Sequence, residues 1–131
     1  MKLFISPPFG NYFNLYNSTS VKGTFTLNPR NGLLKQIFKT LRYSFKNDGW
    51  INKIGLRNKG IKWAIKKYKN TNNIISIAIL NEADINAFNE IIPKNMNLEI
   101  NISCPNIEKK LDLFNIKELL NKNRQFCSIK L

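Results

Sequence analysis

Apolar and polar positions follow two different spacings along the chain, and the spacing changes from one segment to the next. Short apolar runs and period-two alternation predict strands over residues 3–6, 20–27, 74–80, 97–103 and 125–131. Apolar residues at helical spacing predict helices over residues 33–45, 60–69, 82–92 and 114–123. A loop over 7–19, the turn "NPRNG" and an ordered loop over 51–60 separate these elements.

The second half of the chain alternates strand and helix. This order predicts parallel βαβ units with right-handed crossovers. No internal repeat, low-complexity segment or linker divides the 131 residues, so we expect a single domain.

The later strands differ on their two faces, one apolar and the other small or polar. The small and polar face carries Ser76, Ala78, Glu99, Asn101, Ser103, Ser128 and Lys130. A parallel sheet packed on both faces would read as a continuous apolar run, so polarity on one face favours the lumen of a (β/α) barrel that holds a polar ligand. A complete barrel needs about 250 residues, and this chain supplies about five strands. We therefore expect an α/β chain forming a partial (β/α)8 TIM barrel, its first five parallel strands, as one N-terminal half-barrel over residues 1–131.

Charge adds a preference for anionic partners. The 21 Lys and Arg residues outnumber the 8 Asp and Glu residues, which gives a net charge of +13. Nucleic acid, a membrane surface and small anions would all fit this charge. The densest run, "KWAIKKYKN", reads equally well as a solvated helix face, and no stacking-plus-basic pattern of a known nucleic-acid module is present.

Several kinds of location and chemistry are disfavoured. Pro7 and Pro8 interrupt any signal-peptide core, and the apolar run 74–80 is too short to span a bilayer. Two cysteines without CxxC spacing fit a reducing compartment, so we expect a cytoplasmic protein without a membrane partner. The chain has no histidine, which excludes a Ser-His-Asp triad, a Cys-His pair and most zinc sites; we expect no metal. Acid–base chemistry must then rest on Cys, carboxylate, Lys or Tyr.

Two polar loops could carry chemistry. In "NKIGLRN" (52–58), Gly55 would let the backbone approach a planar ligand, although Asn and Gly could also serve turn geometry alone. In "NISCPN", Cys104 follows the carboxyl end of a strand, where barrel enzymes keep catalytic groups, and Pro105 ends the strand. Cys104 could act as a nucleophile or base, or could be a buried small apolar residue.

Lys130 lies at the end of the last predicted strand, on its polar face. A lumenal lysine needs an anion or another acceptor. The alternative is a frayed strand end with Lys130 in solvent.

Taken together and in chain order, these segments resemble dihydroorotate dehydrogenases, the flavin barrel enzymes of pyrimidine synthesis. "TLNPRNG" (26–32) is similar to the family's turn after the second strand, and "INKIGLRNKGIKWAI" (51–65) resembles its orotate-holding segment. "IISIA" (74–78) is similar to its third strand. "LEINISCPN" (98–106) resembles the fourth strand and catalytic loop, and "SIKL" (128–131) the fifth strand with a flavin-contacting lysine.

The resemblance implies FMN as cofactor and dihydroorotate and orotate as ligands. Cys104 would be the base that takes the C5 proton of dihydroorotate while the C6 hydride passes to flavin, and a cysteine here resembles the soluble class. The implied substrate-binding residues are Asn52, Ile54, Gly55, Leu56, Asn101 and Asn106, with Ile54, Gly55 and Leu56 acting through their backbone. The implied cofactor-binding residues are Asn101 and Lys130, with Lys22 as a further candidate.

The chain departs from the family pattern at several places. The helix between the first and second strands is replaced by a loop, and Gly23 stands where the family has a lysine, with Lys22 one position early. Lys53 and Arg57 replace the usual Ser and Pro of the orotate loop. Strands six to eight, which bind the flavin phosphate, have no counterpart. We expect the 131 residues alone to be inactive or incomplete, and a second chain or a homodimer could complete the barrel.

Two other functions stay open. A related FMN enzyme that reduces pyrimidine bases shares the Asn-x-Ser-Cys-Pro loop, although Asn106 favours orotate. A non-catalytic basic module could instead bind nucleic acid through the charge of +13.

Overall fold

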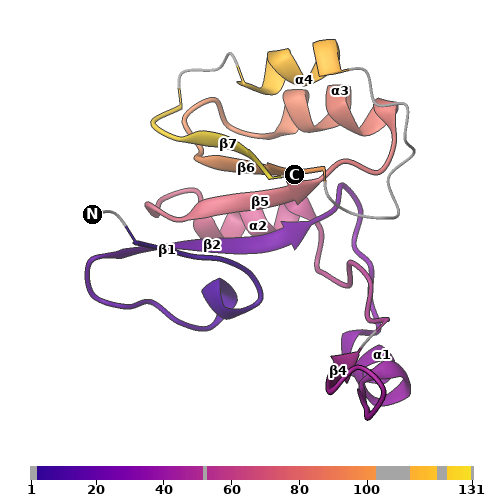
Figure 1. The fold of residues 1–131 in the computed structure, drawn as a ribbon. Helices are drawn as coiled ribbons and strands as arrows, with labels where there is room; N and C mark the ends of the chain where they lie inside the picture. Colours follow the sequence, from indigo (N-terminus) through magenta and orange to yellow (C-terminus); the bar gives the residue numbers. More distant parts are fainter. Residues whose placement is uncertain (1–2, 52, 103–112, 121–123, 131) are drawn as a thin grey trace.

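A five-stranded parallel sheet forms the centre of the molecule (Figure 1). The computed structural model describes residues 3–51, 53–102, 113–120 and 124–130. Along the sheet the strands run in the order β1 (Leu3–Ile5), β2 (Ser18–Phe25), β5 (Ile74–Ala78), β6 (Leu98–Asn101) and β7 (Cys127–Lys130). The sheet is curled into a half-barrel, which confirms the prediction of a partial TIM barrel with about five parallel strands.

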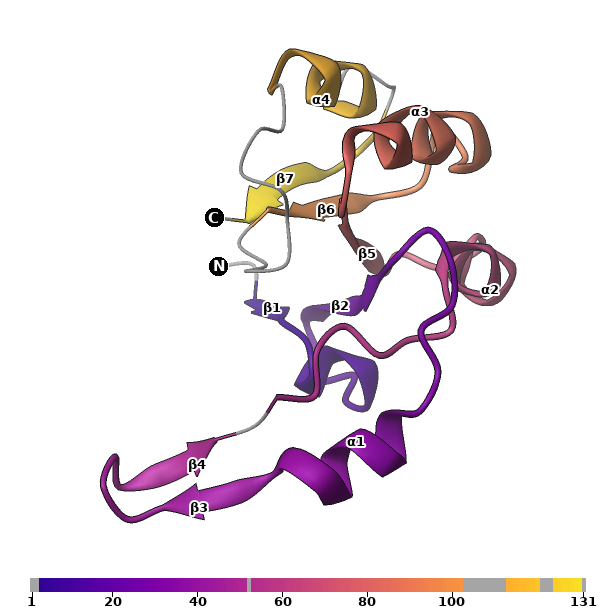
Figure 2. The ribbon, with the colours of Figure 1, turned by 90° about the vertical axis from the view of Figure 1, so that its right-hand side faces the viewer.

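Three helices cover one side of this sheet: α2 (Ile61–Tyr68), α3 (Glu82–Ile91) and α4 (Leu113–Leu120). Figure 2 shows the strands in an arc with these helices on its outer side. The core between the two layers is built from the apolar face of the strands, including Ile75, Ile77 and Ile100, and from helix residues such as Ala64 and Phe88. The strand face that the sequence marked as apolar is therefore the face that packs against helices.

The start of α3 follows directly from its sequence. The Asn81 side chain accepts a hydrogen bond from the Asp84 amide at 3.0 Å, and the Asp84 carboxylate accepts from the amides of Leu80 and Asn81. This capping box satisfies amide groups that the first helical turn leaves unpaired. The helix ends at Ile91 as predicted, to within one residue.

Aromatic rings from the two edge strands meet at the amino end of the sheet. The ring centroids of Phe4, in β1, and Phe126, next to β7, lie 5.3 Å apart. Val21 and Ile74, which pair between β2 and β5, are buried but lie outside the helix-side core. The inner side of the arc therefore has an apolar floor at its amino end.

A loop connects β1 to β2 without an α-helix, as predicted. It contains one 3-10 turn, η1 (Phe9–Asn11), and packs closely on the strands. A Cβ on Gly10 would lie 2.2 Å from the carbonyl oxygens of both Ile5 and Val21, so only glycine fits there.

The prediction of one helix over 33–45 is wrong in its second half. The helix α1 (Leu33–Thr40) ends at Thr40, and a hairpin of β3 (Arg42–Ser44) and β4 (Gly49–Ile51) follows. Leu41 and Phe45 continue the helical spacing of apolar residues in the sequence. In the structure, however, residues 42–44 form a strand because they pair with β4. Figure 2 shows that α1 and this hairpin extend away from the sheet, and α1 has no buried residue.

Candidate functional site

A chain of hydrogen-bonded polar side chains lies on the inner face of the sheet, above the apolar floor. The Ser76 hydroxyl donates to the Glu99 carboxylate at 2.7 Å and lies 3.0 Å from the Thr24 hydroxyl. The Asn101 amide donates to the same Thr24 oxygen at 3.4 Å. Ser76, Glu99 and Asn101 are all buried. The network links β2, β5 and β6 and fixes the direction of the Asn101 side chain.

The last strand extends this polar face. Glu99 pairs with Ser128 and Asn101 pairs with Lys130 in the parallel register of β6 and β7. Residues paired in this way point to the same side of a sheet. Lys130 is exposed, at the carboxyl end of its strand. The structure thus brings together Asn101 and Lys130, two of the residues that the sequence marked for a flavin and its substrate.

The loop that follows β4 is anchored to the same end of the sheet. Asn58 accepts hydrogen bonds from the amides of Thr26 (3.2 Å) and Gly60 (2.8 Å), and donates to Leu56 O at 2.9 Å. Gly55 has φ +67, a conformation that favours glycine, and is exposed. Asn58 therefore holds the predicted substrate segment of Ile54, Gly55 and Leu56 next to the end of β2.

Lys22 lies on the other face of β2. It is in register with Ile75, which belongs to the helix-side core, and its ammonium donates to Gly10 O (2.6 Å) and Asn14 Oδ1 (3.1 Å) in the β1–β2 loop. Burial lowers the pKa of Lys22, and the nearby charge of Lys67 lowers it further. The structure does not bring Lys22 together with Asn101, and a flavin on the inner face would not meet its side chain.

A bulge explains this placement. The four residues of β2 from Lys22 to Phe25 lie opposite the three residues of β5 from Ile75 to Ile77. Gly23 has φ +134, and both hydrogen-bonding groups of its backbone are held by the Asn11 side chain at 2.7 Å. The extra residue turns Thr24 to the inner face and Phe25 to the core.

Asn52, Cys104 and Asn106 lie outside the described residues, so their predicted roles rest on the sequence. Sequence reasoning did not include Thr24, Ser76 and Glu99 among the site residues. For Ser76 and Glu99 the signal was available, because both fall on the polar face of the alternation. For Thr24 it was not, because the bulge breaks the alternation in β2.

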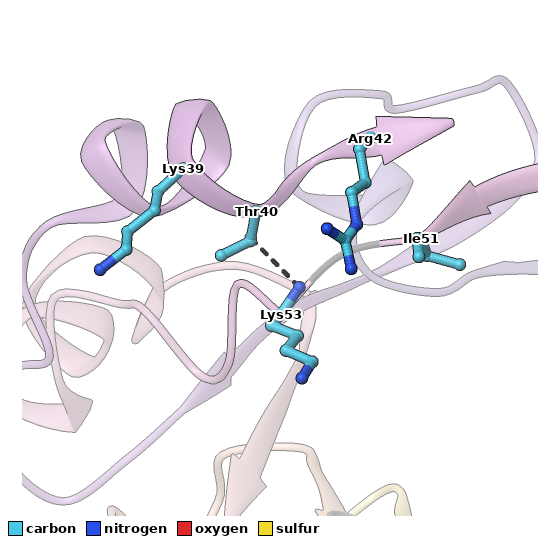
Figure 3. A pocket seen from close by; sticks show the side chains of 5 residues that line it. All are labelled: Lys39, Thr40, Arg42, Ile51 and Lys53. Carbon is cyan, nitrogen blue, oxygen red and sulfur yellow. Dashed lines mark hydrogen bonds between the residues drawn. The ribbon is translucent and has the colours of Figure 1, made fainter. Parts of the chain in front are cut away.

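A second hollow of about 260 Å³ lies away from the sheet, between α1 and the hairpin. Figure 3 shows Lys39 at the end of α1, Arg42 in β3 and Lys53 in the following loop around it, with Thr40 and Ile51. The Lys53 amide donates to the Thr40 hydroxyl at 3.1 Å, which ties the loop to the end of the helix. The three cationic side chains are exposed to solvent.

Comparison with known protein families shows to which family the chain belongs. The family model for dihydroorotate dehydrogenase matches residues 11–128. The chain belongs to the dihydroorotate dehydrogenase family. Searches of curated proteins and of solved structures gave no match.

This membership supports a dihydroorotate dehydrogenase-like function in general terms. Members of the family generally use flavin cofactors, and dihydroorotate and orotate are the ligands that the family suggests. Within the part of the chain that the structure describes, no helix is long and apolar enough to cross a membrane.

Proposed function

We propose that the chain carries the substrate loop and the proton acceptor of an FMN-dependent dihydroorotate dehydrogenase of pyrimidine synthesis. The observation that supports this most strongly is the shared orientation of Asn101 and Lys130 on the polar inner face. An amide and an ammonium at one strand end provide donors and an acceptor for a heterocycle such as a flavin or a pyrimidine.

The residues present fit a flavin and a pyrimidine in chemical type. Asn101 already donates to Thr24, so its amide is oriented before a ligand arrives. Lys130 is exposed beside it and could meet the ring system of FMN. The backbone of Ile54, Gly55 and Leu56, with Asn52 and Asn106, would hold the pyrimidine and its carboxylate. Preorganised donors of this kind reduce the cost of binding.

In the proposed reaction, the cofactor would accept the hydride and the protein would accept the proton. FMN, when bound, supplies the acceptor for the hydride at C6 of dihydroorotate. Cys104 would take the proton from C5, and Asn101 and Asn106 would hold the ring so that the C5–H bond points to the thiolate. No step requires histidine, which the chain lacks.

We further propose that the isolated 131 residues hold FMN weakly. The described sheet has five strands, whereas a closed barrel has eight, and phosphate sites of such barrels commonly lie after strands seven and eight. A second chain or a second copy would complete the barrel, and the activity would be cytoplasmic. Purified chain should therefore contain much less than one FMN per molecule, and stoichiometric FMN would contradict this part of the proposal.

Flavin fluorescence tests whether the inner face binds both ligands. FMN is titrated with the chain in the absence and presence of orotate. We expect weak quenching that orotate strengthens, and loss of the orotate effect in Asn101→Ala. Asn72→Ala, an exposed amide before β5 at the opposite end of the sheet, is the matched control. An orotate effect that survives Asn101→Ala would contradict the proposed site.

The same titration separates the alternative of a pyrimidine-base reductase, which the Asn-x-Ser-Cys-Pro loop also fits. Uracil in place of orotate should have no effect if the carboxylate is recognised. Stronger flavin quenching with uracil than with orotate would favour the reductase instead.

A further inference from the structure

A cavity on the outer side of β2 combines positive charge with aromatic walls. Its volume is about 280 Å³, and it lies between the β1–β2 loop, the substrate loop and α2. The residues that matter here are Phe25, Arg57, Lys59, Trp63, Lys67 and Tyr68. None of its described lining residues is acidic.

The rings form one connected wall. The centroid of Trp63 lies 6.0 Å from that of Phe25 and 5.9 Å from that of Tyr68. The ammonium groups of Lys59 and Lys67 each lie 4.8 Å from the Trp63 centroid. These cation–π contacts hold both ammonium groups against the Trp63 ring. Two like charges are thus held at one ring.

Arg57 adds an unsatisfied donor to this wall. Its Nε is buried and has no hydrogen-bond partner among the described residues, while one terminal nitrogen donates to Asn31 O at 3.2 Å. A buried guanidinium N–H without an acceptor is costly, and a phosphate or carboxylate oxygen is its strongest partner. An acceptor at this position would remove that cost.

A further cation, Lys22, directly precedes Gly23 of the cavity lining. Lys22 is 4% exposed, and its acceptors among the described residues, Gly10 O and Asn14 Oδ1, are both neutral. Burial lowers the pKa of Lys22, and the nearby charge of Lys67 lowers it further. An anion near Lys67 would offset the effect of that charge.

We propose that this cavity binds a small aromatic phosphate, with the phosphate between Arg57 and Lys67 and the ring against the aromatic wall. The volume is close to the lower end of the range for small-molecule sites, about 300–1,000 Å³, so the ligand is small. This site is separate from the proposed flavin face, because it opens on the helix side of β2. The proposal does not depend on the flavin function.

The other basic hollow, lined by Lys39, Arg42 and Lys53, is a weaker candidate. Its lining has no aromatic ring and no buried donor without a partner among the described residues. It serves as an internal control for attraction by charge alone.

Fluorescence of Trp63 tests the proposal. The chain has two tryptophans, so Trp50→Phe leaves Trp63 as the single reporter. Phenyl phosphate, inorganic phosphate and phenol are titrated at constant ionic strength. We expect a saturable change with phenyl phosphate, displacement by inorganic phosphate at higher concentration, and no change with phenol. Absence of a saturable response would overturn the proposal.

Charge-matched variants locate the bound phosphate. Arg57→Gln and Lys67→Gln should each weaken phenyl phosphate binding about tenfold, as expected for loss of one charge-assisted hydrogen bond. Lys66→Gln, on the same helix but outside the cavity, and Lys39→Gln, in the other hollow, should leave affinity unchanged. Equal weakening in either control would show non-specific attraction and overturn the site. If Arg57→Gln does not fold, Lys67→Gln carries the test with the same controls and the same expected loss.

Discussion

Asn101 and Lys130 occupy paired positions on β6 and β7, so an amide and an ammonium point to the same side of the sheet. Each comes from the carboxyl end of its strand, where parallel barrels place their chemistry. A buried network through Thr24, Ser76 and Glu99 supports Asn101 from below. Lys130 has greater exposure than Asn101.

Lys130→Gln should weaken FMN binding several-fold without loss of fold, because the exposed side chain contributes little to packing. Flavin fluorescence in the presence of orotate measures the change. Lys94→Gln removes the same charge from an exposed position before β6 and is the control. Equal loss of binding in both variants would mean that Lys130 acts only through net charge.

Gly23→Ala should destabilise the chain strongly, by roughly 3 kcal/mol or more. A Cβ at residue 23 would lie 2.5 Å from Ser76 O, and φ is +134. Gly32→Ala is a useful comparison, since Gly32 has φ +87 but no atom within 4 Å of the added Cβ. It should cost only about 1 kcal/mol. Urea denaturation of both variants measures the difference; similar losses would contradict the close approach of β2 and β5.

Asn58→Ala should lower the free energy of unfolding by about 2 kcal/mol, because the amides of Thr26 and Gly60 lose their acceptor. The substrate loop should also loosen, seen as faster proteolysis within residues 53–60. Asn58→Asp keeps the acceptor oxygen and loses the amide donor to Leu56 O and to the Thr26 hydroxyl, so it should be less destabilising than Asn58→Ala. Equal destabilisation by Asp and Ala would argue against the acceptor role.

Because of Lys22, the free energy of unfolding should change with pH in the alkaline range. Burial and then Lys67 lower its pKa in the folded state below the ordinary value of 10.5. Between these two pKa values the unfolded chain binds more protons than the folded chain, so the free energy of unfolding rises with pH. Lys22→Met should flatten this rise, and Lys66→Met should not. Denaturant titrations across the alkaline range measure it, and an unchanged slope in Lys22→Met would show that Lys22 is not responsible.

Much of the half-barrel could be predicted from sequence because apolar and polar residues alternate along most of β5 and β6. Ile75, Ile77 and Ile100 marked the helix side, and Ser76 and Glu99 marked the inner side. The α1–hairpin unit could not be predicted in the same way. Its apolar residues, such as Phe38 (86% exposed) and Phe45 (91% exposed), are not buried, so their spacing carries no information about a packed face. The bulge at Gly23 also stayed hidden, since it depends on contact with Ser76 on another strand.

Anaerobic reduction of FMN by dihydroorotate tests the central claim most directly. The chain is mixed with excess FMN, dihydroorotate is added, and the visible absorbance of oxidised flavin is followed. We predict slow reduction that requires both chain and dihydroorotate, and a rate about 10²-fold lower in Cys104→Ala, as expected for loss of a general base. Cys127→Ala, which changes the other cysteine, should reduce FMN at the wild-type rate. Equal rates of FMN reduction in the wild type and Cys104→Ala would contradict the account.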